Sequence, residues 1–96
     1  MAKRPKIMIT MVDKKESGPC HYGHKIGDSF DFDKDRGRMC PMMAHTAFPY
    51  IDILRYGGIV PGEASENECL FCCPDPKVIN VFKIERIQEQ NAAQRG

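Results

Sequence analysis

The sequence predicts an α+β fold in which one kinked helix packs on one face of a small, mostly antiparallel sheet. Two strand-like segments precede one helix-like segment, and two more strand-like segments follow it. A single helix lying on a sheet is the simplest layered arrangement for that order. The chain has 96 residues, enough to bury one small core, so we expect a single domain over residues 1–96.

The first two strands are predicted before residue 34. Residues 6–12, KIMITMV, are rich in β-branched side chains and lead into the turn-forming cluster DKKESGP. Further along, Gly27 and Asp28 mark a turn. Phe30 and Phe32 then alternate with polar residues, as the side chains of a half-buried strand do.

The third predicted element is a helix between Cys40 and Gly58. Pro41 suits the first helical position, and the pair Gly57-Gly58 is a strong C-terminal stop. Residues at helical spacing continue the pattern between these ends, at Ala44, Phe48, Ile51 and either Leu54 or Arg55. Pro49 falls inside this run, where a proline costs about 3 kcal/mol in a regular helix. We therefore expect a kink, or two short helices meeting there.

The last two strands are expected after the loop at residues 59–68, which carries Pro, Gly, Ser and Asn. Residues 69–73, CLFCC, and residues 78–87, VINVFKIERI, are both strand-like. The turn between them, residues 74–77, contains two prolines, which are excluded from the middle of a paired strand. The tail at residues 88–96 has nothing to bury and is expected to fray.

Composition argues against several kinds of partner. The formal net charge is only +1, and no basic block follows the short start Lys3-Arg4-Pro5-Lys6, so we expect no nucleic-acid partner. The apolar run at residues 7–12 is too short for a signal peptide or a membrane span, so we expect a cytoplasmic protein with no membrane partner. Cytosolic thiols stay reduced, and five cysteines cannot all pair with one another. The cysteines are then metal ligands, reactive thiols or small buried residues.

Several sequence blocks follow one another along most of the chain. They are Cys20 followed by Gly23-His24-Lys25-x-Gly27-Asp28-x-Phe30, then Cys40-Pro41, then Leu54-Arg55-Tyr56-Gly57-Gly58, and finally Cys72-Cys73-x-Asp75 leading into Val81-Phe82-Lys83-Ile84-Glu85-Arg86-Ile87. In these blocks the chain resembles a family of small proteins of about this length, of unassigned function and frequent in anaerobic bacteria and archaea. It departs from that family pattern at Met42 and Met43, where aromatic residues are frequent, and Cys69 is an addition to the pattern. The resemblance implies no established reaction.

Cys40 is the first candidate for chemistry. It precedes a proline at a predicted helix start, where unpaired backbone N–H groups and the helix dipole favour an anion. Its thiol should therefore ionise more readily than a free one, which suits a metal ligand or a nucleophile. The alternative is a small buried residue at the helix entry, since cysteine is among the most buried residue types.

Cys20 and His24 form a second candidate group, in which a thiol and an imidazole are separated by three residues. Such spacing can bind a metal. The imidazole of His24 can instead satisfy backbone groups in the turn before Gly27. His45 lies five residues after Cys40, which is more than one helical turn, so we do not place it in the same site.

The CLFCC segment carries the remaining three cysteines. Successive side chains of a strand point to opposite faces, so Cys69 and Cys73 should share one face and Cys72 should lie on the other. Either only one of Cys72 and Cys73 is a ligand, or the strand ends at Cys72 and the turn at Pro74 rotates Cys73 into the same site. The pair Cys69-x-x-Cys72 also has the spacing of zinc knuckles, but a zinc ribbon needs two such pairs and this chain has one.

The predicted metal ligands therefore come from three segments and are Cys20, His24, Cys40, Cys72 and Cys73. We expect the fold to gather them at the end of the sheet beside the helix start. Zinc takes four ligands, and a four-iron cluster is usually held by four thiolates, so the number of candidates fits either cofactor. The resemblance to proteins of anaerobes favours an iron-sulfur cluster over zinc.

The expected function is that of a small, cytosolic, cysteine-rich accessory protein or small subunit that binds a metal centre, beside a larger enzyme or a second copy of itself. Two alternatives stay open: a thiol redox protein or enzyme in which Cys40 reacts with Cys72 or Cys73, and a metal-free module that binds a small molecule or a protein. The sequence has no P-loop, nucleotide-binding fingerprint, nucleophile elbow or HExxH motif. Hydrolytic and phosphoryl-transfer enzymes are therefore not predicted.

Overall fold

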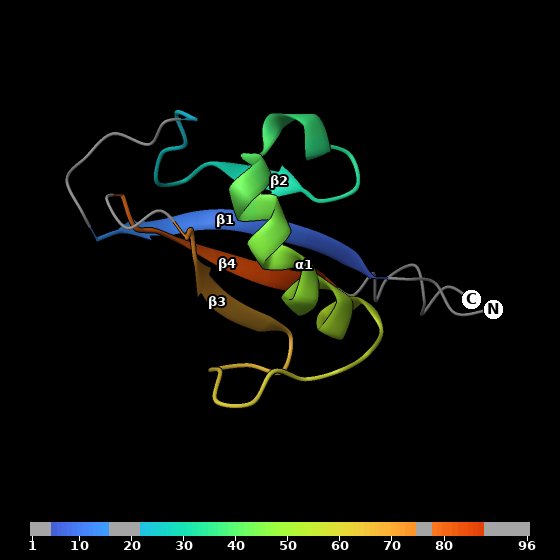
Figure 1. Cartoon of the computed structure of the whole chain (residues 1–96). Coiled ribbons are helices and arrows are strands. Elements are labelled where there is room, and N and C mark those ends of the chain that lie inside the picture. Colours follow the sequence, from blue (N-terminus) through green and yellow to red (C-terminus); the bar gives the residue numbers. More distant parts are fainter. Residues whose placement is uncertain (1–4, 16–21, 75–77, 88–96) are drawn as a thin grey trace.

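The structure, a computed structural model, confirms the predicted α+β class, with a four-stranded antiparallel sheet that carries one helix on one face (Figure 1). It describes residues 5–15, 22–74 and 78–87. The elements in chain order are β1 (Lys6–Lys14), β2 (Ser29–Asp31), the short 3-10 helix η1 (Arg36–Arg38), α1 (Pro41–Arg55), β3 (Glu68–Cys72) and β4 (Asn80–Ile87). The strands lie in the order β2-β1-β4-β3, so the first and last strands form the central pair.

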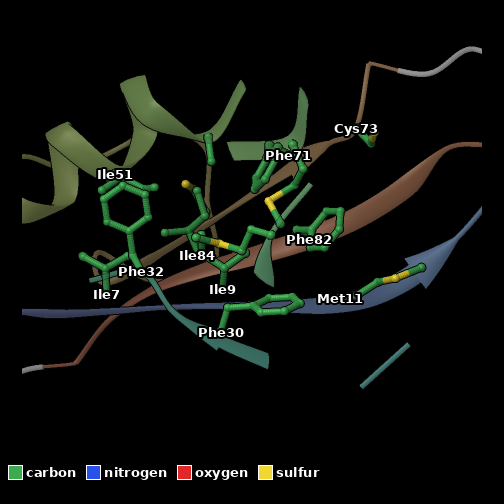
Figure 2. Packing of buried hydrophobic residues seen from close by; sticks show 14 of the residues in the cluster. Ile7, Ile9, Met11, Phe30, Phe32, Ile51, Phe71, Cys73, Phe82 and Ile84 are labelled. Atoms are coloured by element: carbon green, nitrogen blue, oxygen red, sulfur yellow. The ribbon is translucent and has the colours of Figure 1, made fainter. Parts of the chain in front are cut away.

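Alternation along the strands divides the sheet into a covered face, which packs against α1, and an open face. The buried side chains of the covered face are Ile7, Ile9, Met11, Phe30, Cys69, Phe71, Phe82 and Ile84. On the open face, Thr10 and Lys83 are half-buried, and Leu70 is exposed. The core is therefore one layer of apolar side chains between the sheet and α1 (Figure 2).

The ends of α1 lie where the sequence predicts them. Cys40 is the N-cap residue, and Pro41 stands at the first helical position. At the other end Gly57 has φ +89°, and the N–H of Gly58 donates to the carbonyl of Ile53 at 2.7 Å. This is the glycine-terminated helix end known as a Schellman motif. A Cβ at position 58 would lie 2.9 Å from the Ile53 carbonyl oxygen, so this position also requires glycine.

The buried face of α1 differs in part from the predicted one. The residues that α1 buries are Met43, Ala47, Ile51 and Leu54. The prediction is confirmed for Ile51 and Leu54 and wrong for Ala44 and Phe48. Phe48 is 44% exposed and presents its ring to Phe32 edge-on, with the ring centroids 5.3 Å apart. Phe48 covers the rim of the core, and the smaller side chain of Ala47 faces the sheet.

Pro49 lies inside α1, which runs without interruption from Pro41 to Arg55. The alternative of two short helices meeting at Pro49 is therefore wrong. A bend at this proline, which removes one backbone hydrogen bond, stays a prediction.

Arg86 ties the C-terminal end of α1 to β4. Its guanidinium donates to the carbonyl oxygens of Leu54 and Gly58 at 2.9 Å each and of Glu66 at 2.7 Å, and to Oδ1 of Asn67 at 3.1 Å. Leu54 is in the last turn of α1, and Arg86 is near the end of β4. The helix therefore begins toward the opposite end of the sheet, where β4 starts (Figure 1).

Two predictions fall on residues outside the described ranges. Of the predicted turn at residues 74–77 only Pro74 is described, and the tail at residues 88–96 is not. Within the described ranges, no helix is both long enough and apolar enough to cross a membrane.

Candidate metal centre

The segment that carries His24 is fixed to β1 by backbone hydrogen bonds. The N–H of Gly27 donates to the Met11 carbonyl at 2.8 Å, and the N–H of Met11 donates to the Asp28 carbonyl at 2.9 Å. Gly27 has φ +98°, a conformation that residues with a side chain rarely adopt. The predicted turn at Gly27 and Asp28 therefore forms, and it holds the preceding residues, including His24, against the sheet.

His24 lies over the covered face beside two phenylalanines. Its ring centroid is 5.0 Å from that of Phe30 and 6.1 Å from that of Phe82. Nε2 of His24 accepts a hydrogen bond from the backbone N–H of Cys40 at 3.1 Å. His24 is 7% exposed and Cys40 is 2% exposed, so this contact is shielded from water. Two predicted site residues from separate segments thus meet at the start of α1.

This hydrogen bond determines what His24 can do in the geometry observed. An imidazole binds a metal through the lone pair of an unprotonated ring nitrogen. Because Nε2 accepts the Cys40 N–H, the neutral ring carries its proton on Nδ1. Metal coordination by His24 would require this hydrogen bond to break, so a role as a metal ligand stays a prediction.

Cys73 lies at the same end of the sheet, on the covered face. Its N–H donates to the carbonyl of Asn80 at 2.8 Å, which extends the pairing of β3 and β4 by one residue. Figure 2 shows Cys73 at the end of the packed row, beyond Phe71 and Phe82. The rings of Phe71 and Phe82 stack with their centroids 5.5 Å apart, and the His24 ring meets that of Phe82 edge-to-face at 6.1 Å. Cys73 is thus at the end of the covered face, next to the stacked phenylalanines, and His24 reaches Phe82 of the same cluster.

Cys72 lies on the other side of the sheet. It is the last residue of β3 and is exposed on the open face, where it lines an open hollow of about 460 Å³ together with Val12, Leu70 and Val81. The predicted alternation is confirmed, because Cys69 and Cys73 are buried while Cys72 is exposed. The turn does not bring Cys73 to the face of Cys72, so the two neighbouring thiols point to opposite sides of the sheet.

Cys69 is part of the hydrophobic core. It is fully buried and pairs with Ile84 across β3 and β4. Burial raises the pKa of the Cys69 thiol to about 11, and the carboxylates of Glu63 and Glu68 add to this effect. Cys69 is therefore a neutral thiol near pH 7, which does not favour a role as a metal ligand.

The predicted ligand set is described only in part. Cys20 lies outside the described residues, so its position relative to Cys40 and Cys73 stays a prediction. In the described part of the chain, no group of three or more His, Cys, Asp or Glu side chains is arranged to hold a metal ion.

One polar residue of this end of the core was missed by the sequence prediction. Asn80 is 1% exposed and stands on the covered face, two positions before Phe82. The sequence does indicate that Asn80 is buried. Residues 80, 82, 84 and 86 share one face of a strand, and the apolar residues Phe82 and Ile84 show that this is the buried face. An asparagine in a buried apolar row calls for a polar partner.

Comparisons with known protein families, with curated proteins and with solved structures found no match for this chain.

Proposed function

We propose that this protein is a small metal-binding accessory protein or subunit, whose metal centre lies at the end of the sheet beside the start of α1. Cys40 and Cys73 supply two thiolates to the centre. Cys20, which the sequence predicts as a ligand, supplies a third. His24 holds the backbone of Cys40 in place, and Cys72 and Cys69 take no part.

The contact between His24 and Cys40 carries this proposal. These residues are 16 positions apart, and each was a candidate for the same site on independent grounds. A buried imidazole that accepts the N–H of a helix N-cap residue fixes the direction in which that residue's side chain leaves the backbone. Cys40 is also the N-cap residue of α1, next to the unpaired N–H groups of the first helical turn.

The ligand chemistry fits either zinc or an iron-sulfur cluster, since thiolates hold both. When bound, zinc would cross-link the ligand segments, and a cluster would in addition carry electrons. Three thiols leave one of four coordination positions for a group outside this set. That position suits a residue of a larger enzyme or of a second copy of the chain, which agrees with an accessory role in the cytoplasm.

Single cysteine-to-serine substitutions test which thiols bind metal. We expect Cys40→Ser and Cys73→Ser to lose most of the bound iron or zinc when the proteins are purified without air and analysed for metal. Cys72→Ser is the matched control, because it removes the neighbouring thiol from the opposite face and should retain the metal. Equal losses in Cys73→Ser and Cys72→Ser would contradict the assignment of the site to the covered face.

His24→Gln tests the role of the imidazole. The Gln side-chain oxygen can still accept the Cys40 N–H, but an amide is a poor ligand for zinc or iron next to thiolates. If His24 only positions Cys40, His24→Gln should keep at least half of the metal, and His24→Leu should lose more. Complete loss of metal in His24→Gln would instead make His24 a ligand.

A further inference from the structure

The outer edge of β3 carries a row of unused backbone groups. β3 is the last strand in the sheet order and pairs only with β4 (Figure 1). The N–H of Cys73 donates to the carbonyl of Asn80 on β4, and every second residue of an antiparallel strand bonds to the same neighbour. The N–H and carbonyl groups of Glu68, Leu70 and Cys72 therefore point away from the sheet, and no described residue forms a hydrogen bond with them.

The composition of β3 leaves this edge open to another strand. Proteins usually protect a sheet edge with a very short strand, with lysine or with proline. The opposite edge follows this rule, because β2 has only three residues, of which Ser29 and Asp31 are polar. β3 has five residues and contains neither lysine nor proline. Its Leu70 is 48% exposed, and Cys72 is also exposed.

One flank of α1 is apolar as well. Met42, Thr46, Pro49 and Ile53 follow one another three or four residues apart, so they line one side of the helix. Met42 is 43% exposed and Ile53 is 38% exposed. The hydroxyl of Thr46 donates to the Met42 carbonyl of the same helix at 3.0 Å, so it needs no outside partner. This flank contains no charged side chain.

The apolar flank of α1 and the free edge of β3 lie on the same side of the molecule. Tyr50 stacks on Phe71 of β3 with the ring centroids 6.2 Å apart, whereas Arg55 pairs with Asp33, which follows β2. Each residue turns the helix by about 100°, which places the apolar flank beyond Tyr50 and away from Arg55. Tyr50 also brings the middle of α1 level with the middle of β3.

We propose that this side of the molecule binds a second copy of the chain, with β3 pairing antiparallel to β3 of that copy and the two α1 flanks in contact. A two-fold related copy presents the same strand and the same flank, so it satisfies both features at once. An extended segment of another protein would pair with the strand edge and leave the helix flank exposed. Stable interfaces involve about 20–30 residues on each side, so the five residues of β3 would not suffice without α1.

Hydrogen bonding and charge determine the register of this pairing. With Leu70 opposite Leu70 of the second copy, Glu68 lies opposite Cys72, and all three outward-facing positions of β3 are bonded. Any shift of the register replaces one of these pairs by Pro74, which has no N–H, or by Glu66, which lies outside β3. The two Glu68 carboxylates stay apart, since like charges directly opposite each other are unfavourable.

The mass of the full chain in solution tests the dimer. Under reducing conditions, sedimentation equilibrium across a dilution series should give twice the mass of one chain. Leu70→Glu should weaken the dimer at least about tenfold, because two carboxylates would face each other where two leucines met. Within one chain the new carboxylate lies opposite Lys83, which favours folding. Ser29→Glu adds the same charge at the other edge of the sheet and should leave the mass unchanged.

The contribution of α1 is tested by a charge on its apolar flank. Ile53→Lys should also weaken the dimer, because it places a lysine between the two helices. His45→Lys, at an exposed position on another side of α1, is the matched control and should leave the dimer intact. Circular dichroism establishes that each variant is folded. An Ile53→Lys chain that dimerises as tightly as the wild type would overturn the contact between the flanks.

Cross-linking tests the register without relying on a destabilising change. In a Cys72→Ser background, Leu70→Cys should give a covalent dimer with a short bifunctional thiol reagent, because its two thiols would lie opposite each other. Glu68→Cys in the same background should not, because four residues would separate its two thiols along the strands, about 13 Å. Cys72→Ser alone provides the baseline for the other cysteines.

The pairing requires no metal, so its failure and that of the metal centre are separate results. A wild-type chain that stays monomeric at every concentration would overturn the proposal and leave the β3 edge for a segment of another protein. A dimer that Leu70→Glu leaves intact, or that Ser29→Glu weakens equally, would overturn the assignment to β3. Cross-linking of Glu68→Cys in place of Leu70→Cys would overturn the register.

Discussion

At the scale of single residues, burial separates the described cysteines by chemistry. Cys69 is a core residue whose thiol stays neutral, and Cys72 is a surface thiol on the open face. Cys40 and Cys73 are buried at the end of the covered face, beside the polar groups of His24 and Asn80. Cys40 and Cys73 are therefore the two described cysteines that the proposed metal centre uses.

The raised pKa of Cys69 predicts a dependence of stability on pH. The folded state keeps this proton up to about pH 11, whereas the unfolded chain loses it near pH 9. The unfolded state therefore binds fewer protons between these values, and stability falls as the pH rises through that window. Cys69→Ala removes this contribution.

Urea unfolding of the wild type and of Cys69→Ala at pH 7 and pH 10 measures the effect. Wild type should be the more stable protein at pH 7, because Cys69 fills space in the core. That advantage should shrink at pH 10. An advantage of the same size at both pH values would show that burial does not hold the thiol neutral.

At the scale of the elements, α1 is attached near its C-terminal end by two arginines. Arg86 donates to the carbonyl of Leu54 in the last turn of the helix, and Arg55 pairs with Asp33 of the segment after β2 at 2.6 Å. The side chain of Arg55 is 9% exposed, and its guanidinium lies 5.4 Å from the centre of the Phe32 ring. These contacts set the position of the C-terminal end of α1 along the sheet.

Arg86→Met should destabilise the protein by about 3 kcal/mol, since it leaves several buried carbonyl oxygens without donors. Arg86→Lys should lose less stability, because lysine keeps the positive charge. It should still lose some, because lysine has neither the planar shape nor the five donors of arginine. Chemical denaturation checks both values. Arg38→Met, at a side chain that is 68% exposed, is the control and should change stability by no more than about 0.5 kcal/mol. A similarly small effect of Arg86→Met would contradict the structural role of the guanidinium.

Asp33→Asn tests the second attachment. Burial opposes ionisation of Asp33, but hydrogen bonds and positive charge from Arg55 and then Arg36 outweigh it, so the pKa of Asp33 lies below 3.8. The ionised Asp33 carboxylate therefore stabilises the fold fully above pH 3.8, the pKa of this group in the unfolded chain. This stabilisation is lost as the pH falls through the lower pKa of the folded state.

We expect Asp33→Asn to cost about 1–2 kcal/mol at pH 7 and clearly less at pH 2, as measured by urea unfolding at both pH values. Asp52→Asn, at an exposed position on α1, should have little effect at either pH. If the cost of Asp33→Asn were the same at pH 2, the ion pair with Arg55 would not be its source.

The elements could be predicted because their signals are local. Pro41 and Gly57-Gly58 define the ends of the helix, and the alternation of side chains in CLFCC predicts on which face of the sheet each cysteine lies. The rotation of α1 about its own axis was harder to predict, since the neighbouring positions 47 and 48 are both apolar. Which of the two faces the sheet depends on how close the helix packs to the strands, and sequence spacing alone does not contain that information.

At the scale of the whole molecule, the site could be predicted less completely than the fold. Segment ends that gather at one end of a sheet can be inferred from element order, and the structure brings His24 into contact with Cys40. The partner of the His24 imidazole could not be inferred, because a hydrogen bond to a backbone N–H leaves no mark on the sequence of the donor. The same holds for Arg86, whose acceptors are mostly backbone carbonyls.

A metal would also matter for the stability of a molecule this small. A single core of this size supplies on the order of 3–5 kcal/mol of net stability, whereas structural zinc adds on the order of 10 kcal/mol to folding in small domains. The proposed centre would join the start of α1 to the end of β3, at the end of the sheet opposite the Arg86 attachment. The two ends of the helix would then each have their own anchor.

The measurement that tests this account most directly is the metal content per chain of the wild-type protein, purified without air and analysed for iron and zinc. A metal centre that uses Cys40 should give iron or zinc in a fixed ratio to the chain, retained through gel filtration and lost in Cys40→Ser. Neither metal above the buffer background, in a chain that is folded and has its thiols reduced, would contradict it.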